Sequence, residues 1–427
     1  MSKSFIVLFF ICVLVTQSQS VFDEKITARG WSSDVERLST LTHAYKESIP
    51  RLSNRDDVFR GSRIHNSMEH QVVFVIKQSN MEELTRILHD VSDPMSRNYG
   101  QHLSKFEIDE MTSNVESRSI LESYLAKSGA LVTSETLRGE YVTASAAISV
   151  WEKMFDTEFY TFHQTQQDGR INKIVRAEKY SIPKDLEPHI ESVFNTIQIT
   201  PQFYGNHTNP EIIPYDVTGN VYNFPGHTTP ARVRAAYNMG TTIGSVKSTQ
   251  GVFAAASQYY SPSDIGFFLS YFEGVTQPVH KSIGNHSSDG LCSADTSSCD
   301  EGNLDLQYIM SMSPLSPTTF WYTDQSFSRW LTLVANMEEP PLVMSISYGT
   351  EESYLSISEL SAFNTQAIKL SAMGVTLVAA SGDDGAIPRR VRTSGQSACG
   401  YAILFPASCP YVTSVGGTSV RTASPIL

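Results

Sequence analysis

The sequence places two carboxylates four residues apart in the segment Asp300-Glu301-Gly302-Asn303-Leu304-Asp305. Positions i and i+4 of a helix share one face, so Glu301 and Asp305 should point the same way. Like charges at this spacing destabilise an isolated helix by about 0.2–0.5 kcal/mol, so another interaction should compensate. Two crowded carboxylates can share a proton, which suits acid–base chemistry below neutral pH. The alternative interpretation is an exposed acidic helix face.

The distribution of histidine favours the acid pair as the base of this part of the chain. All eleven histidines precede residue 287, and only His280 and His286 follow the segment 199–228. The chain contains no His-Glu-x-x-His zinc motif, no Gly-x-Ser-x-Gly elbow and no Gly-Lys-Ser/Thr phosphate loop. Nucleophilic catalysis here would therefore need a base other than imidazole, and a glutamate of raised pKa can take a hydroxyl proton.

Longer α/β units surround the acid pair and should position it. Apolar runs at 252–256, 342–347 and 374–380 predict buried strands, and the apolar spacing of 357–373 predicts an amphipathic helix. The last strand runs into Ser381-Gly382-Asp383-Asp384-Gly385, a turn at a strand's carboxyl end. Ligands and catalytic groups collect at that edge of open parallel sheets.

The N-terminal half has a different pattern. Residues 72–76 predict a buried strand, and Asn80 is expected to cap the helix that follows. A helix is also expected over 147–155 between two short strands, which favours an α+β sandwich. The composition then shifts to Pro, Asn, Thr and Gly, which indicates a linker and a site of proteolytic nicking.

The termini, composition and cysteines indicate a secretory protein. Lys3, the apolar run 5–15 and Ser18-Gln19-Ser20 are typical of a signal peptide over residues 1–20, and no later segment could span a membrane. A net charge of -12 argues against nucleic acid and anionic membranes as partners. Asn206 and Asn285 begin glycosylation sequons.

Four cysteines remain once Cys12 leaves with the signal. We expect two local disulfides, Cys292–Cys299 and Cys399–Cys409, although four cysteines allow three pairings. A zinc site is the competing interpretation, but the chain has no Cys-x-x-Cys and no nearby histidine, so no metal site is predicted.

Motifs in order along nearly the whole chain resemble the sedolisin family of serine-carboxyl peptidases, closest to its lysosomal tripeptidyl peptidase branch. They are Val91-Ser92-Asp93-Pro94 with Tyr99-Gly100, Thr229-Pro230 with Tyr237-Asn238, Glu301-x-x-x-Asp305-x-Gln307-Tyr308, Ser345-Ile346-Ser347-Tyr348-Gly349, Ala380-Ser381-Gly382-Asp383, Phe405-Pro406-Ala407-Ser408 and Tyr411-Val412-Thr413-Ser414-Val415-Gly416-Gly417-Thr418. One such match is weak, whereas the ordered set is specific.

The resemblance implies an α/β fold: a subtilisin-like parallel-sheet catalytic domain over 229–427, incomplete here, behind a removable ferredoxin-like α+β pro-domain over 21–198. Residues 199–228 would be the linker that carries the activation cleavage. The expected partners are peptide or protein substrates and the chain's own pro-domain, in a lysosome, an acid vacuole or the medium.

The resemblance also implies residue roles in a Ser-Glu-Asp triad that works in acid. Glu301 would be the general base, and Asp305 would orient it and share its charge. Asp383 would line the oxyanion hole, which requires its protonated form; a turn-forming role is the alternative, and Asp384 competes for either role. Ser347, Tyr348 and Gly349 would lie beside bound substrate, with backbone groups pairing with an extended peptide.

The chain departs from the family pattern at its end. The family nucleophile is the serine of a second Gly-Thr-Ser segment beyond Leu427, and the family calcium site would also lie there, so no cofactor is expected in this chain. Ser419 in Gly417-Thr418-Ser419 matches a structural strand by position, not the nucleophile. We expect either an incomplete or alternatively spliced product of an active peptidase gene or a catalytically inactive secreted relative that acts as a binding protein. A wholly unrelated binding module would require the ordered matches to be chance.

Overall fold

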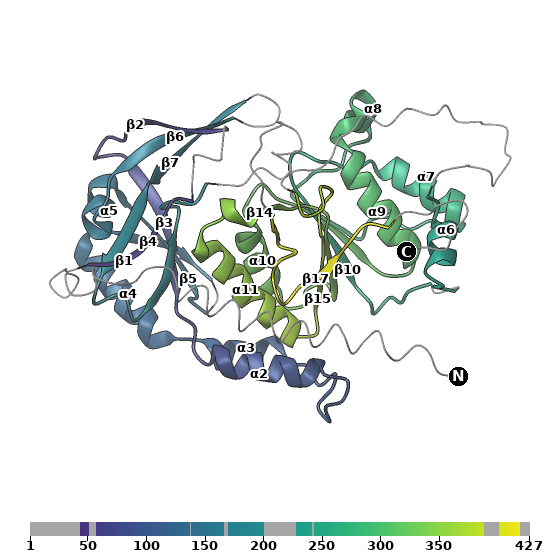
Figure 1. The fold of residues 1–427 in the computed structure, drawn as a ribbon, viewed down its shortest axis with the longest axis horizontal. Helices are drawn as coiled ribbons and strands as arrows, with labels where there is room; N and C mark the ends of the chain where they lie inside the picture. The colour runs from purple at the N-terminus through teal and green to yellow at the C-terminus, as the bar shows by residue number, and fades with distance from the viewer. Residues whose placement is uncertain are drawn as a thin grey trace.

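The computed structural model describes residues 43–50, 57–136, 138–165, 170–199, 228–240, 243–387 and 401–418. The signal peptide, Asn206, Cys399, Ser419 and most of the expected linker lie outside these ranges. The described chain forms an N-terminal part, purple to blue in Figure 1, and a C-terminal part, green to yellow. None of the helices in the described ranges is long and apolar enough to cross a bilayer.

The N-terminal part is built from small antiparallel sheets with helices packed on them. Its largest sheet has the strand order β4-β5-β3-β9, and the others pair β2-β6-β7 and β1-β8. Its elements are β1 (His43–Ser48), β2 (Val58–Arg63), β3 (Glu69–Ile76), α2 (Met81–Ser92), α3 (Lys105–Thr112), α4 (Val115–Ser128), β4 (Leu131–Glu135), β5 (Tyr141–Ala147), α5 (Ile148–Phe155), β6 (Phe159–Thr165), β7 (Ile171–Ala177), β8 (Lys179–Pro183) and β9 (Ile190–Phe194).

The core of this part confirms the predicted strand and helix. Val72, Phe74 and Ile76 of β3 are buried against Trp151 and Phe155 of α5, as the run of apolar residues predicts. The predicted cap of α2 is wrong: Asn80 has φ 53° and its side chain accepts no hydrogen bond from the helix. Its amide instead donates to the carbonyl of Met111 at 2.8 Å, which links α2 to the end of α3.

The C-terminal part is organised around a parallel sheet of order β11-β12-β10-β13-β15-β17. Its elements are α6 (Pro230–Ala236), β10 (Gln250–Ala254), α7 (Pro262–Glu273), β11 (Lys281–Ile283), α8 (Asp289–Ala294), η3 (Thr296–Ser298), α9 (Asp300–Met312), β12 (Thr318–Tyr322), α10 (Phe327–Ala335), β13 (Val343–Ile346), β14 (Thr350–Glu351), η4 (Glu352–Tyr354), α11 (Ile357–Ala372), β15 (Thr376–Ala380), β16 (Leu404–Phe405) and β17 (Thr413–Val415).

Helices cover both faces of this sheet, which explains why its central strands are mostly apolar. One core joins the sheet to α10 and α11, through Trp330, Phe363 and Leu370 among others. A second core joins it to α7 and α9. Figure 1 shows α7 and α9 toward one side of the sheet and α10 and α11 toward the N-terminal part. The sequence therefore predicted the mixed α/β class and its parallel sheet correctly.

The N-terminal part packs on α11. Leu84 and Leu88 of α2 share an apolar cluster with Ile368 and Ala372 of α11, and Figure 1 shows α2 and α3 running beneath this helix. A buried ion pair joins Lys369 of α11 to Glu140.

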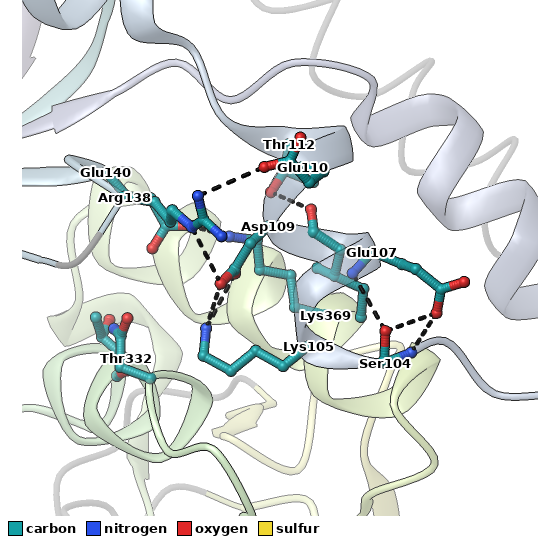
Figure 2. A network of polar contacts seen from close by, with 12 residues as sticks. Ser104, Lys105, Glu107, Asp109, Glu110, Thr112, Arg138, Glu140, Thr332 and Lys369 are labelled. Atoms are coloured by element: carbon teal, nitrogen blue, oxygen red, sulfur yellow. Dashed lines mark hydrogen bonds and ion pairs between the residues drawn. The ribbon is translucent and has the colours of Figure 1, made fainter.

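Polar contacts surround that ion pair. Lys105 and Asp109 form a second buried pair within α3 at 2.8 Å, and Arg138 approaches Asp109 at 3.6 Å (Figure 2). Buried charges are tolerated when they are paired, so both pairs fit the interior in which they lie.

Candidate active site

The acid pair lies on α9, whose position is fixed by close packing and by a disulfide. Gly302, Leu306 and Met310 form the buried face of this helix. A Cβ atom at Gly302 would lie 2.2 Å from the Tyr259 carbonyl oxygen, so glycine alone permits this approach. Cys299 directly precedes the helix and forms a disulfide with Cys292 across a Cα–Cα distance of 5.5 Å, which confirms the first predicted bridge.

Glu301 and Asp305 meet a serine from the neighbouring strand. Ser347 follows the last residue of β13, and its hydroxyl donates a hydrogen bond to Asp305 Oδ1 at 2.6 Å. Ser347 also lowers the pKa of Glu301, which counters part of the effect of burial. The backbone N–H of Glu301 donates to Gln258 Oε1 at 3.1 Å, which holds the first turn of α9. These contacts supply the compensation that the like charges require.

Burial raises the pKa of both acids. Desolvation first, then the charge of Asp383, raises the pKa of Glu301 to about 7. Desolvation and the Glu301 charge raise the pKa of Asp305 well above its ordinary value. Asp305 Oδ2 is buried and has no hydrogen-bond partner among the described residues, which further disfavours the ionised form. The pair therefore holds a shared proton more tightly than two ordinary carboxyls would.

The Asp383 turn lies at the same edge of the sheet as the acid pair. Ile346 of β13 pairs with Ala379 of β15, so Ser347 and the turn after Ala380 emerge side by side. Gly382 adopts φ 93° and lies so close to Leu404 that a Cβ atom would overlap it. Asp383 is exposed, whereas Asp384 beside it is half-buried. Ser347, which bonds Asp305, and Asp383 line the same small cavity at this edge.

A small cavity of about 60 Å³ lies between the β13 end and this turn. Ser347, Tyr348 and Gly349 line one side of it, and Asp383 and Asp384 line the other. The Tyr348 side chain is 1% exposed and packs edge-on against Phe253 at 5.5 Å. Tyr348 thus contributes backbone to the cavity, while its ring belongs to the core.

The remaining predicted positions have mixed outcomes. Cys409 is a free, buried thiol, so the predicted Cys399–Cys409 disulfide is wrong for this structure. Cys409 packs in the same core as α11. Cys399 lies outside the described residues. Asn285 is exposed on a turn with φ 60°, where its sequon is accessible. No cluster of three or more metal-binding side chains occurs within the described ranges.

Sequence reasoning missed the side chain of Ser347 and the amide of Gln258. Ser347 was expected to contribute backbone only. The available signal was its position directly after a buried strand, where the side chain reaches the carboxyl edge of the sheet. Gln258 carried no signal, since a single glutamine in a loop matches no motif.

The chain is similar to known proteins over most of its length. The activation domain of pro-kumamolisin matches residues 57–199. Tripeptidyl-peptidase 1 of Canis lupus familiaris is 28% identical over 84% of this chain and 63% of its own length, and that of Homo sapiens is 29% identical over 83% and 62%. Tripeptidyl-peptidase SED2 of Arthroderma otae is 26% identical over 97% of this chain and 71% of its own length.

By these matches the chain is similar to peptidases of the sedolisin family. The solved structure of Pseudomonas sedolisin, a serine-carboxyl proteinase, is 22% identical over 46% of this chain and 55% of its own, with a TM-score of 0.36. The chain spans about 62–63% of the length of the two tripeptidyl-peptidase 1 proteins named above. The family model falls on the N-terminal part, which is similar to the pro-kumamolisin activation domain and is here called the pro-domain.

Proposed function

We propose that this chain is part of the proenzyme of an acid serine-carboxyl peptidase of the tripeptidyl-peptidase type. The enzyme would act on peptides in the secretory route, a lysosome, an acid vacuole or the medium. Glu301 is the general base, Asp305 orients it and shares its charge, and Asp383 lines the oxyanion hole. The nucleophilic serine would come from sequence beyond the printed chain, because no serine here has the family position.

The observation that carries this proposal is the acid pair beside the Asp383 turn. A base must lie within hydrogen-bond reach of the proton that it takes. The Ser347 hydroxyl donates to Asp305 Oδ1 at 2.6 Å, and a small cavity lined by Ser347 and Asp383 adjoins the pair at the carboxyl edge of the sheet. In the reaction, Glu301 would take the nucleophile's proton as its oxygen attacks the peptide carbonyl, and later return it to the leaving amine.

Two features support the pro-domain as a covalently linked partner of the peptidase part. The order β4-β5-β3-β9, with helices after β3 and β5, matches the split βαβ pattern of a ferredoxin-like fold. Contacts of α2 and Glu140 with α11 join the pro-domain to the helix that leads into the Asp383 turn. The proposed boundaries remain 21–198 for the pro-domain and 229–427 for the peptidase part.

The test substitutes Glu301→Gln in a chain continued through the C-terminal segment of its relatives. We expect loss of tripeptide release at acid pH, by roughly a hundredfold or more, because general-base catalysis contributes about 10²–10⁴-fold. Glu338→Gln is the matched control, since Glu338 is exposed and lies outside the candidate site. Secretion should be unchanged in both variants. Cleavage by Glu301→Gln at the rate of the control would remove Glu301 as the base, and no cleavage by any variant would favour the binding-protein alternative.

A further inference from the structure

The Ser347 hydroxyl lies at the acid pair. It follows the end of β13, its hydroxyl donates to Asp305 Oδ1 at 2.6 Å, and it lowers the pKa of Glu301. A hydroxyl has one proton, so it can donate fully to one carboxyl at a time. The second oxygen of Asp305 has no hydrogen-bond partner within the described ranges. The ionised carboxylate of Asp305 therefore depends on the hydrogen bond that Oδ1 accepts from Ser347.

We propose that Ser347 is a positioning residue for the acid pair: its hydroxyl holds the Asp305 carboxyl one helical turn from Glu301 and supplies the donor that the ionised pair needs. This role goes beyond the backbone pairing expected of residues 347–349. It rests on the proposed function only insofar as the pair acts as the base. Because Ser347 also lines the cavity beside the Asp383 turn, a peptide bound there would lie against the residue that holds the acids.

The groups around the acid pair raise the pKa of Glu301, and the Ser347 hydroxyl acts against that increase. Burial raises the pKa of Glu301 most, and the Asp383 and Asp300 carboxyls raise it further when they are ionised. Tyr348 lies buried beside both acids and its own pKa is raised by desolvation and by their charges. The described residues provide no ion pair to either acid, and the Ser347 contact lowers the pKa of both. A base that must work in acid depends on such a donor, because only the ionised form accepts a proton.

The decisive experiment is a pH titration of the carboxyl groups by difference infrared spectroscopy on the chain as printed. Protonated carboxyls give a C=O band separate from that of carboxylates, and Glu301→Gln and Asp305→Asn identify the bands of the pair. In Ser347→Ala the titration of the pair should move to higher pH, because the donor to the ionised form is lost. Ser347→Thr keeps the hydroxyl and should titrate like the wild type. Ser345→Ala, two residues earlier on β13, is the matched control and should leave the titration unchanged.

A peptidase carrying the C-terminal continuation provides a second readout. Ser347→Ala should lower kcat/KM by roughly tenfold to a hundredfold, the range expected for a hydrogen bond to a charged group. It should also move the acidic limb of the pH–rate profile upward, which simple loss of folded protein would not do. Ser347→Thr should recover most of the rate.

The outcomes separate this inference from the proposed function. An unchanged or downward-shifted titration in Ser347→Ala overturns the positioning role, whether or not the protein cleaves peptides. An upward shift in a protein that never cleaves peptides supports the positioning role and rejects the peptidase. Equal upward shifts in Ser345→Ala and Ser347→Ala would mean a general disturbance of β13 and would also overturn the inference.

Discussion

Replacing Gly302 with alanine should destabilise the protein, because the steric cost of the added methyl group exceeds the gain in helix propensity. Gly302 lies in α9 between Glu301 and Asp305. A Cβ atom there would be 2.2 Å from the Tyr259 carbonyl oxygen, about 1.2 Å closer than ordinary van der Waals contact at 3.4 Å. The obstacle is backbone, so rotation of a side chain cannot relieve it.

The magnitude follows from two opposing effects. Alanine favours a helix over glycine by about 1 kcal/mol, whereas forcing an extra methyl group into a packed site costs about 1–3 kcal/mol. Because the contact is with a carbonyl oxygen that cannot give way, we expect the upper end of that cost. The free energy of unfolding should fall by about 1–2 kcal/mol, and α9 should move outward and carry Asp305 away from Ser347.

The matched control is Gly266→Ala in α7. Gly266 lies inside a helix of the same part of the chain, and its Cβ position has no heavy atom within 4 Å. This variant should be more stable than the wild type by up to about 1 kcal/mol. Urea unfolding followed by tryptophan fluorescence measures both, since Trp321 and Trp330 lie in the core of this part. If Gly302→Ala were as stable as Gly266→Ala, the close approach of α9 to Tyr259 would be wrong.

Two further predictions concern the contacts of α11. Lys369→Met should destabilise the chain by about 3–5 kcal/mol in urea unfolding, because it leaves Glu140 buried without its cation. The control Arg86→Met breaks the exposed pair with Glu83 and should cost no more than about 1 kcal/mol. Equal losses of stability in the two variants would contradict the burial argument. Glu359, which caps the start of α11, has a pKa raised by burial to about 7. Its contribution to stability is fully present below about pH 4.5 and is lost as the pH rises through about 7, on the order of 3 kcal/mol in all. Glu359→Gln should flatten the stability profile between those values, measured by unfolding at pH 4.5, 6 and 8, and a profile as steep as that of the wild type would refute this assignment.

The sequence alone determined features that depend on local patterns. Apolar runs marked β3, β10, β13 and β15, because strands buried on both faces need continuous apolar residues. The i, i+4 spacing put Glu301 and Asp305 on one helix face, and a sequence separation of seven between Cys292 and Cys299 was short enough to predict their bridge. These inferences succeeded because the interacting residues are close in the chain.

Only the tertiary structure decided what the acid pair meets and how strongly it holds protons. Ser347 lies 42 residues from Asp305 in sequence, and their contact depends on the register of β13 beside α9. The pKa of Glu301 depends on burial and on the charge of Asp383, which follows a different strand. Likewise, the free thiol of Cys409 and the Glu140–Lys369 pair across 229 residues follow from how α11 and its neighbours pack. Desolvation and long-range contact arise only when distant segments exclude water together, so neither can be read from local spacing.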